Sequence, residues 1–178
     1  VQALERVSST AAWELTIVGA TDRSPETTAA LKSQIEASPL ASRIRTIGGL
    51  PESTLADFYQ RSDVLVLSSL YEGYGMVLTE ALARGLAIVC TIGGAAAETL
   101  PEGTALKVEA GSARALAWSI GRVMEPETGA RKRLSEAAWA AAGKLPRWDD
   151  TARTIARVIA SRRRCPPDRP WLTSRGKW

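Results

Sequence analysis

The chain has 178 residues, of which 45% are hydrophobic and 24% charged, enough for one globular domain with a sizeable core. It contains no histidine, which excludes a Ser-His-Asp or Cys-His catalytic centre and a histidine-rich zinc site. Cys90 and Cys165 form no disulfide framework and no CxxC pair. No apolar run approaches the roughly 18 residues of a membrane-spanning helix. No cationic and apolar leader opens the chain, so we expect a cytoplasmic location.

The net charge of +4 is concentrated at the C-terminus. Residues 161–178 carry six basic side chains and one acidic one, so residues 1–160 have a net charge of −1. A basic face for nucleic acid is therefore not expected. The basic tail leaves peripheral contact with anionic lipid or another protein open, and a solvated end is the simpler alternative. We expect a folded domain over residues 1–160 and a basic, proline-rich tail over residues 161–178.

Strand-like and helix-like segments alternate along the chain. Short apolar runs predict five strands, at residues 14–20, 43–49, 63–69, 86–91 and 104–109. Helices are predicted between and after them, at residues 24–38, 51–62, 76–84, 112–124, 130–142 and 149–163. Ser24 and Pro25 suit the start of the first helix, as N-cap and first helical residue. Gly85 suits the end of the third helix.

This alternation predicts an α/β fold, a Rossmann-like parallel sheet with helices on both faces. The apolar middle of residues 63–69 predicts a strand that is buried on both faces. Ligands of such sheets bind beyond the carboxyl ends of the strands. That rule points to the loops that follow Gly19, Gly48, Ser69 and Thr91.

The loop after Ser69 belongs to the segment SSLYEGYGMVLTEALARG, residues 68–85. Its glycines let the backbone turn tightly, and the amides at the following helix start favour an anion such as phosphate. Glu72 and Glu80 cannot neutralise a phosphate, so hydroxyls of a sugar or ribose are their natural partners. Such a charge-assisted hydrogen bond is worth about 1.5–3 kcal/mol. The alternative is that Glu72 caps the turn and Glu80 lies on a solvated helix face.

The order of these parts resembles the donor-site signature of retaining glycosyltransferases of the GT-B fold, most closely glycosyltransferase family four (group one). The matching parts are SS, YEGYG, the second glutamate of an E-x7-E motif, ALARG and LAIVC. The resemblance extends over about residues 10–160, through IVG, RIRTIGGLPESTLADFYQRSDVLVLSS, GGAAAETL and Trp148 before the last helix. It implies the C-terminal, donor-binding half of a GT-B enzyme. Such an enzyme moves a hexose from a nucleoside-diphosphate sugar to a glycan, lipid or small-molecule acceptor.

The resemblance implies a role for each matching residue. Glu72 would be the catalytic residue, bound to the donor sugar's hydroxyls near the reacting centre, and Glu80 would hold the ribose hydroxyls. The other substrate-binding positions would be Gly73, Tyr74 and Gly75 for the sugar, Met76 and Val77 for the diphosphate, and Gly19, Gly49 and Leu50 for the nucleotide. Gly93 and Gly94 would shape the rim, and Glu98 would be structural.

The implied mechanism retains the anomeric configuration and uses no cofactor and no metal. The absence of an Asp-x-Asp motif agrees with that. Two local departures exist: VGATD replaces a glycine-rich turn, and Met76–Val77 replaces a commoner Leu–Pro or Leu–Thr. The Ala- and Arg-rich composition suggests a bacterial source, and polysaccharide biosynthesis is the usual setting of such enzymes.

The largest departure is length, because GT-B enzymes react in a cleft between two domains. The sequence lacks the N-terminal acceptor-binding domain, the first strand of the C-terminal domain and the Arg/Lys pair after it. We therefore expect an acceptor-binding domain as partner, in cis or in trans, and little activity from this chain alone. The alternatives are a non-catalytic nucleotide-sugar-binding or interaction module, and a sugar-nucleotide epimerase, which fits YEGYG less well. The sequence names neither the sugar, the base nor the acceptor.

Overall fold

The structure is a computed structural model of the chain, and it describes residues 1–7, 11–94, 96–145 and 147–162. The chain forms two compact units, Val1–Lys144 and a second unit that begins at Leu145. The predicted domain boundary lies at residue 160, so the two divisions differ by about the length of the last helix. The predicted extent of the domain stays a prediction, and its tail from residue 163 onward lies outside the described residues.

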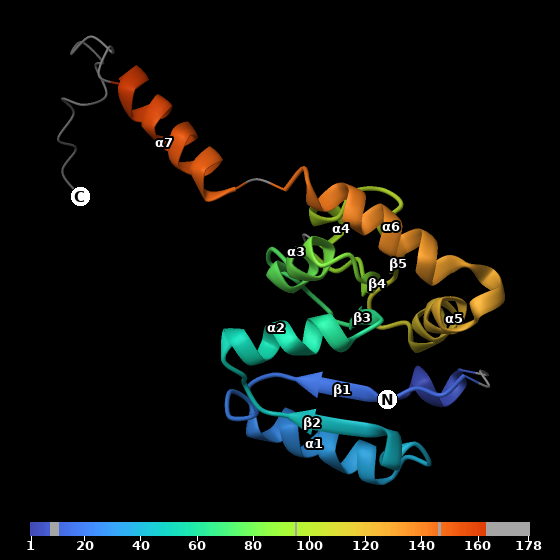
Figure 1. The fold of residues 1–178 in the computed structure, drawn as a ribbon. Helices are drawn as coiled ribbons and strands as arrows, with labels where there is room; N and C mark the ends of the chain where they lie inside the picture. The colour runs from blue at the N-terminus through green and yellow to red at the C-terminus, as the bar shows by residue number, and fades with distance from the viewer. Residues whose placement is uncertain (8–10, 95, 146, 163–178) are drawn as a thin grey trace. The chain divides into compact units, whose positions relative to one another are not determined.

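The first unit is built on parallel strands, as the sequence predicts. They form a two-stranded sheet, β1–β2, and a three-stranded sheet in the order β3–β4–β5 (Figure 1). The strands are β1 (Leu15–Val18), β2 (Ile44–Ile47), β3 (Val64–Leu67), β4 (Ala87–Thr91) and β5 (Ala105–Val108). Each lies inside one of the five predicted apolar runs, and the α/β fold class is confirmed.

Helices connect these strands and cover them. α1 (Pro25–Glu36), α2 (Glu52–Arg61) and α3 (Met76–Ala83) link successive strands from β1 to β4. α5 (Ala113–Met124) and α6 (Ala130–Ala142) follow β5 and pack on β4 and on each other. The short helices are α4 (Ala96–Thr99) and the 3-10 turns η1 (Leu4–Arg6), η2 (Ala41–Arg43) and η3 (Pro126–Thr128). Among the described helices, none is both long and apolar enough to cross a membrane.

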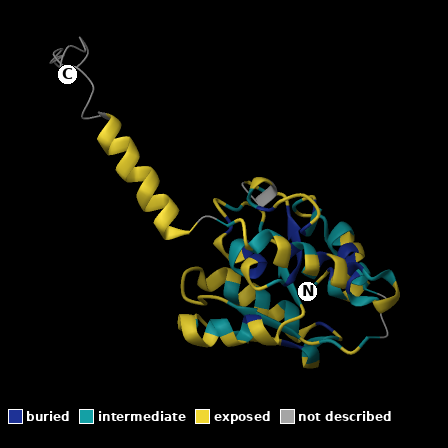
Figure 2. Ribbon diagram, turned by 45° about the horizontal axis from the view of Figure 1, so that its top comes forward, coloured by how far each residue is buried: buried dark blue, intermediate teal, exposed yellow. Residues whose placement is uncertain are grey.

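β4 is the centre of the core, since all five of its residues are buried (Figure 2). Ala87 and Val89 belong to one apolar cluster with residues of α5 and α6, including Ile120 and Leu134. Side chains alternate along a strand, so Ile88 and its neighbour Cys90 face the opposite side, where they are also fully buried. The helices therefore cover both faces of this strand, as a parallel sheet requires.

β3 differs from the prediction, because its four residues are half-buried and not buried on both faces. Within the described chain, β3 pairs with β4 along one edge only, and β1 pairs only with β2. A strand without a second neighbour leaves one row of backbone groups and the adjoining side chains open. The apolar sequence VLVL is typical of an interior strand, and the missing neighbour explains why its burial is incomplete.

The end of α3 and the start of α1 test the helix boundaries that the local sequence predicts. α3 ends as predicted: Gly85 has φ +68°, its amide donates to the Leu82 carbonyl, and the Leu86 amide donates to the Ala81 carbonyl. At the start of α1, Ser24 occupies the N-cap position, but its hydroxyl bonds the Thr27 hydroxyl at 2.8 Å. The expected cap from Ser24 to the helix backbone is therefore absent.

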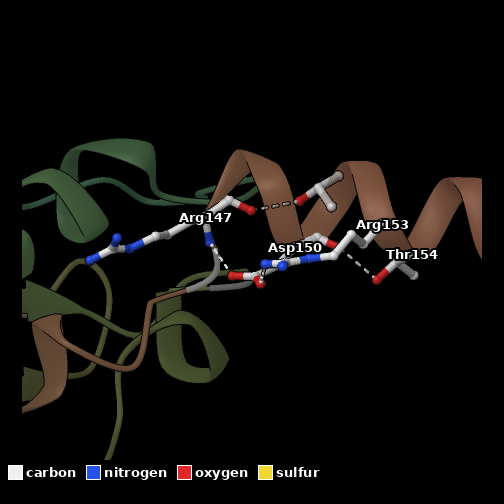
Figure 3. Close-up of polar contacts among 5 residues, drawn as sticks. Arg147, Asp150, Arg153 and Thr154 are labelled. Atoms are coloured by element: carbon white, nitrogen blue, oxygen red, sulfur yellow. Dashed lines mark hydrogen bonds and ion pairs between the residues drawn. The ribbon is translucent and has the colours of Figure 1, made fainter.

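The described part of the second unit is dominated by α7 (Trp148–Arg162). Its first turn is closed by Asp150, whose carboxylate accepts the Arg147 amide at 3.0 Å and the Arg153 guanidinium at 2.6 Å (Figure 3). This is the reciprocal half of a capping box, in which the third helical residue reaches back to the N-cap amide. These hydrogen bonds hold the pKa of Asp150 below its ordinary value, the Arg147 amide contributing most.

Candidate functional site

The corner between β3 and α3 is held by backbone packing against the loop after β4. The Glu72 amide donates to the Gly93 carbonyl at 3.0 Å, and Glu72 forms a parallel bridge with Gly94. A Cβ atom on Gly93 would lie 2.1 Å from the Leu70 carbonyl oxygen, so only glycine fits this approach. The glycine pair predicted to shape the rim thus extends the β3–β4 pairing into the turn that carries Glu72.

The Glu72 carboxylate caps the start of α3 from inside its own turn. One oxygen accepts the Gly75 amide at 3.2 Å, and the other accepts the Ser69 hydroxyl at 3.5 Å. Gly75 is the N-cap residue of α3 and has φ +81°, a left-handed conformation that favours glycine. The turn-capping interaction considered for Glu72 is therefore present, and Glu72 itself is half-buried.

The start of α3 offers free backbone donors. The Leu78 and Thr79 amides both donate to the Gly75 carbonyl, whereas the amides of Met76 and Val77 find no acceptor among the described residues. Free amides at a helix N-terminus, together with the positive end of the helix dipole, form a site for an anion. The side chains of Met76 and Val77 are exposed, so this end of α3 is open to a ligand.

Glu80 lies in α3 and is half-buried, which differs from a glutamate on a solvated helix face. The Tyr59 hydroxyl of α2 donates to Glu80 Oε2 at 2.9 Å, and only 7% of Tyr59 is exposed. Burial raises the pKa of the Tyr59 phenol, and the hydrogen bond and charge of Glu80 raise it further. The sequence analysis did not single out Tyr59, although a buried tyrosine needs a partner for its hydroxyl.

The three predicted nucleotide contacts lie at the two-stranded sheet. Gly19 follows β1, and its amide donates to the Ile47 carbonyl at 3.2 Å, while Gly49 and Leu50 follow β2. A Cβ atom on Gly19 or Gly49 would meet nothing within 4 Å, so the space beyond these strand ends is open. Gly73, next to Glu72, is equally open. The structure gathers Glu72 and the α3 amides at one corner and places these three residues at the ends of β1 and β2.

A surface cavity of about 560 Å³ lies at the amino-terminal ends of β3 and β4, whereas the Glu72 turn follows the carboxyl end of β3. Asp63 and Leu86, which precede these strands, line it together with Tyr59, Arg84 and Trp139. Neither Glu72 nor Glu80 lines this cavity, although Tyr59, which lines it, donates to Glu80. Among the described residues, no three acidic or cysteine side chains gather closely enough to hold a metal ion.

Parallel strands, a tight glycine turn after β3 and free amides at the start of α3 define an α/β protein with an anion-binding type of strand–helix corner. The family model of the glycosyl transferases group 1 matches residues 1–140. The chain therefore belongs to this family of glycosyltransferases.

Three similar proteins illustrate the relationship. Mannosylfructose-phosphate synthase of Agrobacterium fabrum is 38% identical over 64 residues, which are 36% of this chain and 14% of that protein. A glycosyltransferase from Rickettsia africae has a TM-score of 0.80 at 24% identity, over 93% of this chain and 44% of the other. Anabaena HepE, solved in complex with UDP-glucose, has a TM-score of 0.76 at 22% identity, over 89% and 43%. This chain spans less than half of each, and the two solved structures show the fold alone.

Proposed function

We propose that the chain is the C-terminal, donor-binding domain of a retaining GT-B glycosyltransferase of family four. The enzyme would transfer a hexose from a nucleoside-diphosphate sugar to a glycan, lipid or small-molecule acceptor. The observation that carries the proposal is the corner, where Glu72, Glu80 and the free Met76 and Val77 amides belong to one strand–turn–helix unit. Membership in the family supports it, as does the UDP-glucose bound to Anabaena HepE.

In this proposal the diphosphate lies against the start of α3. The amides of Met76 and Val77 donate to its oxygens, and the helix dipole favours its charge. Gly73, Tyr74 and Gly75 contact the sugar, and Gly19, Gly49 and Leu50 line the nucleotide pocket. Glu80 accepts hydrogen bonds from the ribose hydroxyls. Its half-buried carboxylate needs donors, and an ionised phosphate supplies none.

Glu72 lies next to the reacting centre and accepts hydrogen bonds from the sugar hydroxyls. Transfer breaks the bond between the anomeric carbon and the diphosphate and forms a bond from the same face to the acceptor oxygen, whose proton passes to the leaving diphosphate. The charge that develops on the leaving diphosphate is stabilised by fixed amides and the helix dipole, so electrostatic stabilisation dominates. The proposal includes no metal and no cofactor, because the backbone donors and dipole of α3 supply the stabilisation.

The proposed reaction needs an acceptor-binding domain, in cis or in trans, as the second wall of the cleft. The solved relatives are more than twice as long as the matched part of this chain, which is consistent with such a partner. Peripheral membrane contact through the basic tail remains part of the proposal, and residues 163–178 lie outside the described residues. Neither partner is needed for nucleotide binding, so binding is the property to measure first.

Calorimetric titration with nucleoside diphosphates and their sugar conjugates tests the donor-binding role. We expect at least one nucleotide to bind, and Glu80→Ala to weaken its affinity about 10-fold or more, because two hydroxyls lose a charged acceptor. Glu72→Ala should weaken binding of the sugar conjugate and leave binding of the bare nucleotide unchanged. Glu36→Ala, at the exposed end of α1, is the matched control and should change neither affinity.

Binding of no nucleotide, or equal behaviour of all three variants, would refute the proposal. Binding without transfer after the acceptor domain is added would favour the non-catalytic module.

A further inference from the structure

Tyr59 connects two helices through a single charged hydrogen bond. It lies in α2, twenty-one residues before Glu80 of α3, and its hydroxyl donates to Glu80 Oε2 at 2.9 Å. The ring is almost fully buried, so the hydroxyl has few other partners within reach. A hydrogen bond between a buried phenol and a carboxylate is charge-assisted, and it restricts the carboxylate to one orientation.

Arg84 contacts the Tyr59 ring and forms no ion pair with the Glu80 carboxylate. Its guanidinium lies over the Tyr59 ring at 4.7 Å, and its Nη1 donates to the backbone carbonyl of Glu80 at 3.0 Å. No ion pair among the described residues includes the Glu80 side chain. The cation therefore contacts the Tyr59 ring and the Glu80 backbone, and it forms no ion pair with the Glu80 carboxylate.

The second carboxylate oxygen of Glu80 remains available. Tyr59 is the one described residue that donates to this side chain, and it donates to Oε2, so Oε1 is left for a ligand. The terminal torsion of a free glutamate is broad, and ordering it on binding has an entropic cost. The raised pKa of Tyr59 keeps its phenol protonated, so this restraint is present in the ligand-free protein.

We propose that Tyr59 is a positioning residue that holds Glu80 Oε2 and so presents Oε1 to the vicinal hydroxyls of a nucleotide's ribose. The inference rests on the proposed function, which gives Glu80 the ribose. It adds that α2, the helix before β3, takes part in ribose recognition through α3. A nucleotide that lacks the ribose hydroxyls cannot use Glu80 Oε1, so its affinity should not depend on Tyr59. Comparing it with the ribose form separates positioning from a general effect on folding.

The test compares uridine and guanosine diphosphates with their 2′,3′-dideoxy forms on Tyr59→Phe, which keeps the ring and the Arg84 contact. Affinity for the ribose forms should fall about 3- to 10-fold, as expected for one hydrogen bond, while the dideoxy forms bind unchanged. In a Glu80→Ala background the same substitution should have no effect on any of these nucleotides. Arg84→Met is the matched control: it should lower the melting temperature and leave the ratio of ribose to dideoxy affinity unchanged.

Each outcome decides something. An unchanged affinity in Tyr59→Phe, equal losses for ribose and dideoxy forms, or a loss that persists in Glu80→Ala would overturn the positioning role. An equal change of the ribose ratio in Arg84→Met would also overturn it, because the network would then act only through stability. If the unmodified chain binds no nucleoside diphosphate of the titration panel, the proposed function fails together with this inference. Binding by the unmodified chain with no Tyr59 effect overturns the inference alone.

Discussion

Glu72 and Glu80 belong to one motif, but their carboxylates have different partners. Glu72 accepts the Gly75 amide of its own turn, and Glu80 accepts the Tyr59 hydroxyl of another helix. The first contact is local and follows from a tight turn before a helix. The second depends on where the fold places α2 relative to α3, which no spacing within the motif determines. The capping role predicted as an alternative thus applies to Glu72, and the solvated face does not apply to Glu80.

The capping role of Glu72 predicts a loss of stability that is independent of any ligand. Glu72→Ala should lower the free energy of unfolding by about 1 kcal/mol, because the Gly75 amide loses its acceptor. Glu72→Gln keeps an acceptor oxygen and should lose less. Urea unfolding without nucleotide measures both. Glu36→Ala, a surface substitution, should stay within about 0.5 kcal/mol of the unmodified chain. A loss in Glu36→Ala as large as that in Glu72→Ala would contradict the cap.

Gly93 makes a second prediction at the scale of one residue. Gly93→Ala would bring a Cβ atom to 2.1 Å from the Leu70 carbonyl oxygen, and neither backbone can yield without breaking the Glu72–Gly94 bridge. We expect a loss of about 3 kcal/mol, measured by urea unfolding. Gly121→Ala is the control, since nothing lies within 4 Å of its Cβ position in α5, and it should stabilise by about 1 kcal/mol or less. Similar stability of the two variants would rule out the close approach.

The motif in the sequence predicts candidate site residues, but it does not indicate the residues that contact them. It located Glu72, Glu80 and the α3 amides because a strand–glycine–helix order is written in consecutive residues. Tyr59 was not among the predicted site residues, since its partner is 21 residues away. The glycine pair was expected at a rim, and the structure adds that Gly93 lies against the Leu70 backbone and Gly94 against the Glu72 backbone. Long-range contacts of this kind depend on packing, which a single sequence does not display.

At the scale of elements, the prediction was accurate where local chemistry decides the end of a helix. Gly85 ends α3 in a left-handed conformation, and Pro25 begins α1, as their positions indicate. The short helix α4 was not among the predicted helices, because four residues are too few to show a helical period. The burial of β3 was overestimated, because the sequence does not say which strands are its neighbours.

The start of α7 gives a prediction about pH. The pKa of Asp150 is lowered by the Arg147 amide and then by Arg153, so its ionised form stabilises the first turn. The contribution is complete above the ordinary pKa of an aspartate, about 3.9, and disappears as pH falls through the lowered value. NMR secondary shifts of α7 should therefore lose helicity at its N-terminus in acid. Asp150→Asn should abolish this dependence, and Asp149→Asn, which removes no described hydrogen bond, should keep it. A pH dependence unaltered in Asp150→Asn would refute the assignment.

At the scale of the whole first unit, the division between the two sheets has a simple geometric meaning. The observed orders are β2–β1 and β3–β4–β5, all parallel. One more parallel strand between β1 and β3 would give the order of a dinucleotide-binding sheet, 3-2-1-4-5-6. The resemblance to the GT-B fold predicts such a strand. The open edge of β3 among the described strands accounts for its half-burial.

Hydrogen exchange can test whether these two edges are open. β4 pairs on both sides, so all its amides should be protected, whereas alternate amides of β1 and β3 should exchange quickly because they point away from their one partner. β4 serves as the internal reference in the same sample. In a longer chain that supplies the expected strand, the fast amides of β1 and β3 should become protected together, because one strand would satisfy both edges. Uniform protection of β1 and β3 in the present chain would mean that the two sheets already join. Protection of only one edge in the longer chain would place the strand elsewhere.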